Sequence, residues 1–243
     1  MVWVILPIKD FVQAKTRLSG VLAPHERRSL MQAMVEDVLS VLCSHSEIER
    51  VVLVSDDPAA ELLAGKYQIE SLDERSLGSQ GLNSAVTAAS DVLIGQGATK
   101  LLVMHGDIPL LAATDISALV DSFHAGDVDV VIAPDEAGTG TNALLFSANN
   151  PPLFEFGENS CQKHMESIAG SAGKVQRIDR LGLALDIDEP ADLHRLVIAM
   201  ESGEGGEHCR ELMLESGVHQ RLKAMAEDGF DLVAVRSATV SEG

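Results

Sequence analysis

Apolar residues along the chain fall into short unbroken runs and longer stretches with a helical period. The runs VVLV, LLVM and VVIA (51–54, 101–104 and 130–133) are apolar at every position, which is typical of strands buried on both faces. Residues 24–43 instead place apolar side chains at steps of four, as an amphipathic helix does. Strands that alternate with helices predict βαβ units. We therefore expect an α/β fold, a single domain with a mixed, mainly parallel sheet and helices on both faces.

The same pattern predicts where most elements and one boundary lie. After a flexible break at 202–206 (SGEGG), a charged helical stretch over 207–228 and a strand-like FDLVAV follow. This divides the chain into a domain over 1–203 and an appendage over 204–243. The sequence leaves open whether the appendage packs on a partner subunit, as it would in a homodimer. Strands are expected at 2–8, 51–54, 101–104, 128–133, 143–146 and 183–187, and helices at 24–43, from Pro58, at 81–94, 114–123 (N-cap Thr114), 161–169 (N-cap Ser160) and 190–200.

Composition narrows the class of protein. The 243 residues carry 18 Lys and Arg against 37 Asp and Glu, a net charge of -19, and only 3% are aromatic. Such a chain repels polyanions and lacks stacking platforms, so nucleic acid and anionic membranes are poor partners. The three cysteines are scattered, and neither a signal peptide nor an apolar run of spanning length is visible. These features indicate a cytoplasmic protein.

The distribution of charge suggests two kinds of ligand. Residues 1–30 hold five basic and two acidic side chains, whereas no Lys or Arg occurs over 101–162. Lys9, Lys15 and Arg17 follow the first strand, where open α/β sheets bind ligands, and would suit a polyphosphate. The alternative is a solvated basic surface, which we favour for Arg27 and Arg28.

Carboxylates follow several predicted strands. Asp107 comes after LLVMHG, and Asp186 and Asp188 lie in LALDIDEP, two apart, so that in a strand they would point the same way. Carboxylates are natural ligands of Mg²⁺, so these three predict a magnesium site. The alternatives are a turn cap for Asp107 and a helix cap before Pro190 for Asp188. Asp56 also follows a predicted strand, at 51–54. The alternative is that Asp56 or its neighbour Asp57 caps the helix that begins at Pro58.

Two turns could bind an anion without basic side chains. The Gly- and Thr-rich turn 138–142 exposes amides and hydroxyls, and FGENS (156–160) leads into a helix N-terminus. By composition alone, both are also compatible with ordinary turns. No GxGxxG follows the first strand and no GxxxxGK[ST] occurs, so Rossmann dinucleotide and P-loop sites are not supported. His105 and His164 are expected to be structural or surface residues.

Together these motifs resemble the CofC/FbiD family, the guanylyltransferases of coenzyme F-420 biosynthesis. The resemblance runs in order over about residues 2–200. It rests on WVILPIK with AKTRL, ERR at 26–28, VSD at 54–56, GLN at 81–83, GDIPL at 106–110, GTGTNALL from Gly138, FGENS and LALDIDEPADL.

The resemblance implies a GT-A, Rossmann-like nucleotidyltransferase with GTP as substrate and Mg²⁺ as cofactor. The acceptor would be 2-phospho-L-lactate, phosphoenolpyruvate or 3-phospho-D-glycerate. Carried over by motif, Asp107, Asp186 and Asp188 would hold the metal, and Thr141, Gly157 and Ser160 the acceptor. Nucleotide contacts would come from Lys9, Lys15, Arg17, Asp56 and Asn83, with Lys15, Arg17 and Asp107 as the catalytic residues.

Two alternatives are weighed against this interpretation. A transferase of the same fold could use a sugar phosphate or the molybdenum cofactor as acceptor, but such families open with a Gly-rich LAGG-type loop, which LPIKDFVQAK does not match. A non-catalytic nucleotide-binding module would tolerate loss of a metal carboxylate, yet all three are present.

Overall fold

A seven-stranded sheet forms the centre of the computed structural model, which describes residues 1–9, 11 and 15–227. The order is β3-β2-β1-β4-β6-β5-β7, and every neighbouring pair is parallel except the two that involve β6. The sheet is therefore mixed and mainly parallel, as predicted. Its strands are β1 (Val2–Pro7), β2 (Ile48–Val54), β3 (Glu70–Leu72), β4 (Lys100–Met104), β5 (Val130–Pro134), β6 (Thr141–Ser147) and β7 (Val175–Arg177).

Helices cover both faces of this sheet, because side chains on its strands alternate between two apolar clusters. In β1, Val4 and Leu6 join one cluster and Ile5 joins the other. The first cluster is covered by α1 (Pro24–Ser44), α2 (Pro58–Tyr67) and α4 (Ala113–Ala125), and the second by α3 (Leu82–Gly95) and α5 (Ser160–Gly170). No helix in the described part of the chain is long and apolar enough to cross a membrane.

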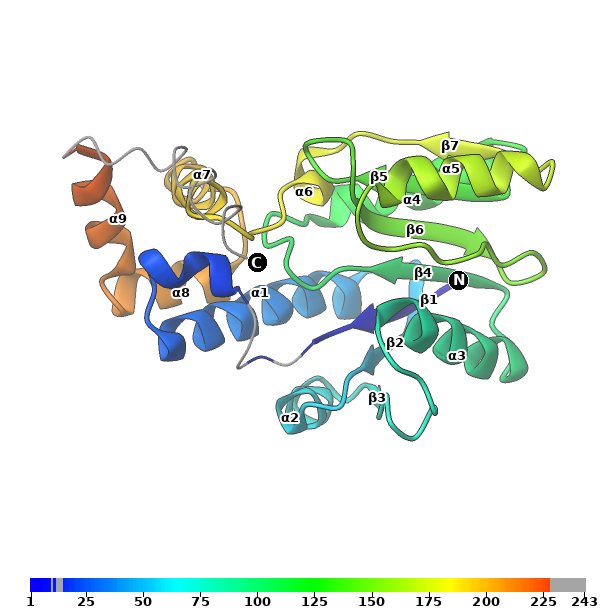
Figure 1. The fold of residues 1–243 in the computed structure, drawn as a ribbon, viewed down its shortest axis with the longest axis horizontal. Helices are drawn as coiled ribbons and strands as arrows, with labels where there is room; N and C mark the ends of the chain where they lie inside the picture. Colours follow the sequence, from blue (N-terminus) through cyan, green and yellow to red (C-terminus); the bar gives the residue numbers. More distant parts are fainter. Residues whose placement is uncertain (10, 12–14, 228–243) are drawn as a thin grey trace, which may run out of the picture.

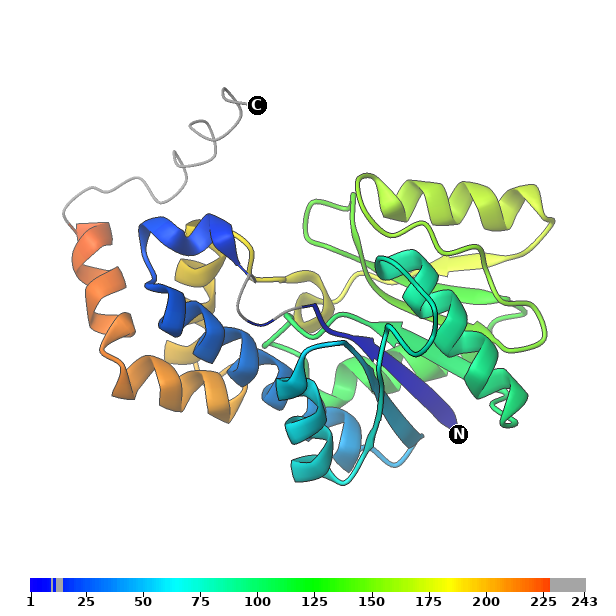
Figure 2. The same cartoon turned by 60° about the horizontal axis from the view of Figure 1, so that its bottom comes forward.

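The remaining helices are η1 (Thr16–Gly20), α6 (Leu181–Ala184), α7 (Pro190–Glu201), α8 (Glu207–Glu215) and α9 (Val218–Glu227). Figures 1 and 2 both place α7, α8 and α9 at one end of the molecule, beside α1. The charged stretch predicted over 207–228 thus forms two helices, and FDLVAV lies outside the described residues.

The prediction of a strand over 183–187 is wrong. Leu183, Leu185 and Ile187 are buried at alternate positions, as the pattern indicated, but this segment joins no strand. The Asn142 amide donates to the carbonyls of Leu183 and Ala184 at 2.9 and 3.3 Å, so a side chain satisfies groups that a ladder would otherwise use. Residues 181–184 form α6, and irregular backbone carries the aspartates that follow.

Two predicted caps differ from those observed, and the alternative role of Asp188 as a helix cap is wrong. Asn159, not Ser160, is the N-cap of α5, and Ala112, not Thr114, precedes α4. Glu189 rather than Asp188 caps α7, which leaves the Asp188 side chain available to the cavity described below. The alternative that Asp56 or its neighbour caps the helix at Pro58 is confirmed for Asp57, whose side chain accepts a hydrogen bond from the Ala59 amide at 2.9 Å.

A buried carboxylate joins α8, in the predicted appendage, to α1. Asp37, in the middle of α1, accepts from the backbone amides of His208 and Cys209 at 2.9 and 3.0 Å. These amides belong to the first turn of α8, whose unpaired N–H groups favour a negative charge. Asp37 thus acts as a cap supplied by a distant helix, and α8 is held against α1.

Candidate active site

A cavity of about 810 Å³ lies at the ends of β1, β2 and β4, the edge where open α/β sheets bind ligands. It brings together most of the residues predicted for the site, although they are spread over almost the whole domain. Those that line it are Lys9, Lys15, Asp56, Asp107, Thr141, Gly157, Ser160, Asp186 and Asp188.

Lys15 is the centre of the charged side of this cavity. Its Nζ lies 2.5 Å from Asp107 Oδ2 and 2.7 Å from Asp188 Oδ1, and its side chain is only 5% exposed. Burial alone would lower the pKa of Lys15, but the two carboxylates outweigh it and raise the pKa above its ordinary value. Burial likewise favours protonated Asp107, yet Lys15 holds the pKa of Asp107 below its usual range. Both groups are therefore charged at neutral pH.

Asp186, the third of these carboxylates, has a raised pKa, in contrast to Asp107. Burial, followed by the negative charges of Asp107 and Asp188, raises the pKa of Asp186 to about 6. Asp107 Oδ1 is also buried, and no described residue forms a hydrogen bond with it. This side of the cavity therefore has unsatisfied affinity for positive charge.

These residues do not form a ready-made metal cage. Over 1–9, 11 and 15–227, no three His, Cys, Asp or Glu side chains are grouped closely enough to hold an ion. The Lys15 ammonium instead bridges Asp107 and Asp188. Mg²⁺ commonly takes one or two carboxylates and completes its shell with substrate phosphates and water. The oxygen donors and the unpartnered Asp107 Oδ1 fit such an ion.

Uncharged donors line another part of the cavity, the neutral-donor wall, which is formed by Thr141, Gly157 and Ser160. Thr141 begins β6, and Ser160 is the first residue of α5; both are buried, and their hydroxyl oxygens lie 3.1 Å apart. Gly157 has a φ of 123°, a conformation that glycine adopts without strain, and a Cβ there would meet no atom within 4 Å. Backbone amides and hydroxyls at a helix N-terminus are suited to an anion such as a carboxylate.

Two predicted site residues lie elsewhere. Arg17 is 68% exposed and its Nη1 approaches Glu189 Oε1 at 3.5 Å. Asn83 is not in contact with the cavity, because its amide donates to the Phe156 carbonyl and accepts from the Phe156 amide, at 3.1 and 2.8 Å. Asn83 therefore holds the FGENS loop in place.

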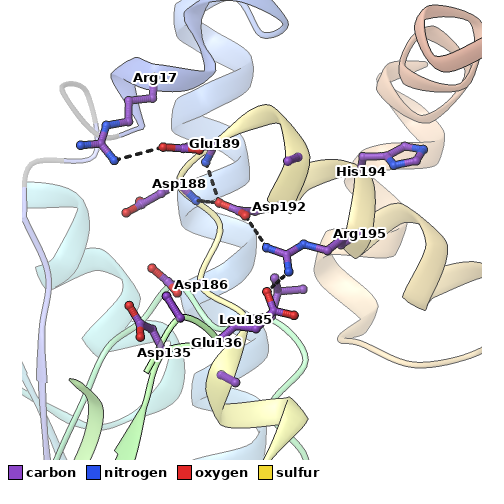
Figure 3. A pocket seen from close by; sticks show the side chains of 13 residues that line it. Arg17, Asp135, Glu136, Leu185, Asp186, Asp188, Glu189, Asp192, His194 and Arg195 are labelled. Carbon is purple, nitrogen blue, oxygen red and sulfur yellow. Dashed lines mark hydrogen bonds and ion pairs between the residues drawn. The ribbon is translucent and has the colours of Figure 1, made fainter. Parts of the chain in front are cut away.

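Arg17 lines an adjoining pocket of about 610 Å³ (Figure 3). Asp135, Asp186 and Asp188 border both spaces. Behind them Asp192 accepts from the backbone amides of Asp188 and Glu189, at 3.0 and 2.8 Å, which fixes the direction of the segment that carries the carboxylates.

Four polar residues that line the cavity, Glu74, His105, Asp135 and Asn142, were not predicted as site residues, and two of them directly follow strands. Asp135 follows β5, and its carboxylate accepts from the Thr139 amide at 2.8 Å. His105 follows β4, and its ring lies tilted against the Phe156 ring with centroids 5.5 Å apart. Its Nε2 is buried and has no hydrogen-bond partner in the described part of the chain, and burial lowers the pKa of His105. Asp135 and His105 both lie directly after strands, so the rule that selected Asp107 could have found them.

Comparison with known proteins agrees with this architecture. The family model "Guanylyl transferase CofC like" matches residues 2–226. Phosphoenolpyruvate guanylyltransferase from Conexibacter woesei is 37% identical over 86% of this chain and 93% of that protein. 2-phospho-L-lactate guanylyltransferase from Methanothermobacter thermautotrophicus is 34% identical over 86% of this chain and 89% of that protein.

Solved structures support the fold. A putative nucleotide-diphospho-sugar transferase from Desulfovibrio desulfuricans superposes with a TM-score of 0.75, at 16% identity, over 91% of this chain and 97% of its own. A 4-diphosphocytidyl-2C-methyl-D-erythritol synthase gives 0.57 at 15% identity, over 82% and 97%.

Proposed function

Because the chain belongs to the CofC-like guanylyl transferase family and is a nucleotidyltransferase, we propose that it transfers GMP from GTP to a small phosphorylated three-carbon acid. The acid would be 2-phospho-L-lactate, phosphoenolpyruvate or 3-phospho-D-glycerate. The products would be pyrophosphate and a guanylyl diphosphate-linked intermediate of coenzyme F-420 biosynthesis. The observation that carries this proposal is the single cavity that joins a lysine–aspartate cluster to a wall of neutral donors.

In the proposed reaction a phosphate oxygen of the acid attacks the α-phosphorus of GTP, and pyrophosphate leaves. A phosphate monoester has a second pKa of about 6, so the nucleophile is already an anion at pH 7 and needs no general base. The difficulty is to bring two anions together. Lys9 and Lys15 would offset phosphate charge, while Thr141 and Ser160 would orient the acid, so catalysis is positioning plus electrostatics.

We propose Mg²⁺ as the cofactor, held by Asp107, Asp186 and Asp188. When bound it would neutralise phosphate charge and align the reacting groups. Lys15 would then exchange its contact with one carboxylate for a phosphate oxygen, since its flexible stem allows a short movement. The neutral-donor wall would bind the carboxylate of the acid, because no Lys or Arg lies in the chain over 101–162.

A pyrophosphate-release panel tests this proposal. GTP, ATP, CTP and UTP are each combined with each of the three acids, with and without Mg²⁺. We expect release with GTP, Mg²⁺ and at least one acid, and loss of turnover in Asp107→Asn. Asp127→Asn is the matched control, since Asp127 is exposed and pairs with Lys174 away from the cavity. No release from any combination, or release that is independent of the acid, would contradict the proposal.

A further inference from the structure

A buried histidine lies directly behind the neutral-donor wall. His164, on α5, is 0% exposed and packs edge-on against the Phe156 ring, with centroids 5.0 Å apart. Its Nε2 lies 2.9 Å from the backbone nitrogen of Glu155, and its Nδ1 lies 3.1 Å from Thr141 Oγ1. Both ring nitrogens are therefore in use, one by the backbone and one by a residue of the cavity.

The backbone contact determines where the proton on His164 lies. The Glu155 amide can only donate, so Nε2 must accept and carries no hydrogen. The single hydrogen of the neutral ring is then on Nδ1, which donates to Thr141 Oγ1. Burial lowers the pKa of His164 to about 4, which agrees with a neutral ring at pH 7.

Thr141 receives a second hydrogen bond from the other side. The Ser160 hydroxyl donates to Thr141 Oγ1 at 3.1 Å, so both acceptor positions of this oxygen are occupied. The hydroxyl hydrogen of Thr141 has no acceptor among the described residues, and Thr141 lines the cavity. That hydrogen is available to a ligand.

We propose that His164 is a positioning residue that makes the Thr141 hydroxyl an obligatory donor to an oxygen of the three-carbon acid. The inference rests on the proposed function, because it concerns the acceptor side of the same cavity. His164 does not touch the acid; it acts through Thr141. The ligand group taken at this point must accept a hydrogen bond, as a carboxylate oxygen does.

Three substitutions of His164 separate this role from simple packing. His164→Phe keeps a ring against Phe156 but loses both hydrogen bonds. His164→Gln can place an amide oxygen near the Nε2 position and keep the Glu155 contact while losing the donor to Thr141. His164→Asn can place an amide N–H near the Nδ1 position and restore that donor.

The measurement is steady-state kinetics with whichever of the three acids the wild type uses best, together with calorimetric titration of GTP. We expect His164→Phe and His164→Gln to raise the KM for the acid by about tenfold or more, because a buried donor loses its fixed direction. GTP affinity should stay within about twofold of wild type. His164→Asn should recover most of the acid KM, which a structural role would not predict.

A double-mutant cycle with Thr141→Val completes the test. If His164 acts through Thr141, His164→Gln should change the acid KM less than about twofold in the Thr141→Val background. Equal losses for acid and GTP, an unchanged acid KM in both His164→Phe and His164→Gln, or additive effects in the cycle would overturn the inference. If His164→Phe does not fold, His164→Gln decides the result alone. Absence of wild-type turnover with every acid is a different outcome, and would remove the proposed function itself.

Discussion

Lys15 supplies the positive charge that keeps Asp107 and Asp188 close together. Replacing it with alanine leaves two carboxylates 19% and 49% exposed, with Asp186 beside them and no cation between them. Removing one partner of a buried ion pair typically costs about 3 kcal/mol or more, and solvent around the half-exposed Asp188 reduces the expected cost here to about 1–3 kcal/mol. We expect Lys15→Ala to lower the free energy of unfolding by that amount in EDTA, measured by urea titration. Arg17→Ala is the control, since its exposed side chain should change stability by less than about 0.5 kcal/mol.

Added Mg²⁺ should separate the two proposed roles of this cluster. An ion bound by the carboxylates would replace the lost positive charge, so Mg²⁺ should restore part of the stability of Lys15→Ala and little in Arg17→Ala. Equal unfolding midpoints for Lys15→Ala and wild type in EDTA would show that the bridge contributes nothing to stability.

The raised pKa of Asp186 predicts an unusual pH dependence. Between pH 3.8, the ordinary pKa, and about pH 6, Asp186 is protonated in the folded protein and ionised in the unfolded chain. The free energy of unfolding therefore rises as the pH falls through 6. At pH 7.5 the charge of Asp186 is unfavourable, and Asp186→Asn should raise the free energy of unfolding by about 1–2 kcal/mol in EDTA. The gain should shrink toward pH 5.

Asp121→Asn, on the exposed face of α4, is the control for this titration and should show no such pH-dependent gain. A difference between Asp186→Asn and wild type that is constant from pH 5 to 7.5 would mean that Asp186 does not titrate in this range.

At the level of elements, the contact between α1 and α8 depends on a glycine. A Cβ on Gly206 would overlap the Asp37 carboxylate, which accepts from the α8 amides. We expect Gly206→Ala to lower the free energy of unfolding by about 2 kcal/mol, as overpacking of a close contact does. Gly65→Ala is the matched control: Gly65 is on the exposed face of α2, a Cβ there would meet no described atom within 4 Å, and the substitution should stabilise by about 0.5–1 kcal/mol. Urea denaturation measures both, and a neutral Gly206→Ala would show that α8 can shift without cost.

The elements also show how far sequence reasoning reached. Long helices such as α1 and the fully apolar strands were predicted correctly, because their periodicity is local. The segment before Asp186 was not, because the Asn142 amide replaces strand pairing there, and Asn142 is more than forty positions away in the chain. The short strands β3 and β7 carry no strong apolar pattern of their own.

The candidate site was predictable in part for a similar reason. The carboxyl ends of parallel strands converge at one edge of a sheet, so Lys15 and Asp107, which follow β1 and β4, could be expected to meet. Thr141 begins β6 and reaches the same edge only because β6 runs antiparallel to β4, a direction that the sequence pattern does not indicate. The role of Asn83 could not, since its partner is the backbone of Phe156, a contact that no residue type in the sequence signals. The direct ion-pair contacts of Lys15 with Asp107 and Asp188 likewise could not be predicted, because they join residues that are far apart in the sequence.

At the scale of the whole molecule, a net charge of -19 opposes the approach of a nucleotide. Among the described residues that line the cavity, Lys9 and Lys15 carry the positive charges that act in the other direction. Added salt shortens the range of the repulsion, to about 10 Å at 0.1 M. We expect the association rate of a fluorescent GTP analogue to rise about twofold from 20 to about 150 mM KCl, measured by stopped flow. Choline chloride should act as KCl does, and a rate that falls with salt would show that the local lysines dominate.

The cap that Asp37 places on α8 also has a consequence for the order of events during synthesis. Asp37 and its amide partner at His208 are separated by 171 positions. At about 5–20 residues per second, the ribosome needs roughly 10–30 s to make that stretch. Throughout this interval the middle of α1 carries a carboxylate whose backbone donors do not yet exist. That face of α1 therefore closes only after residue 208 has been made, and early folding must depend on the sheet side of the helix.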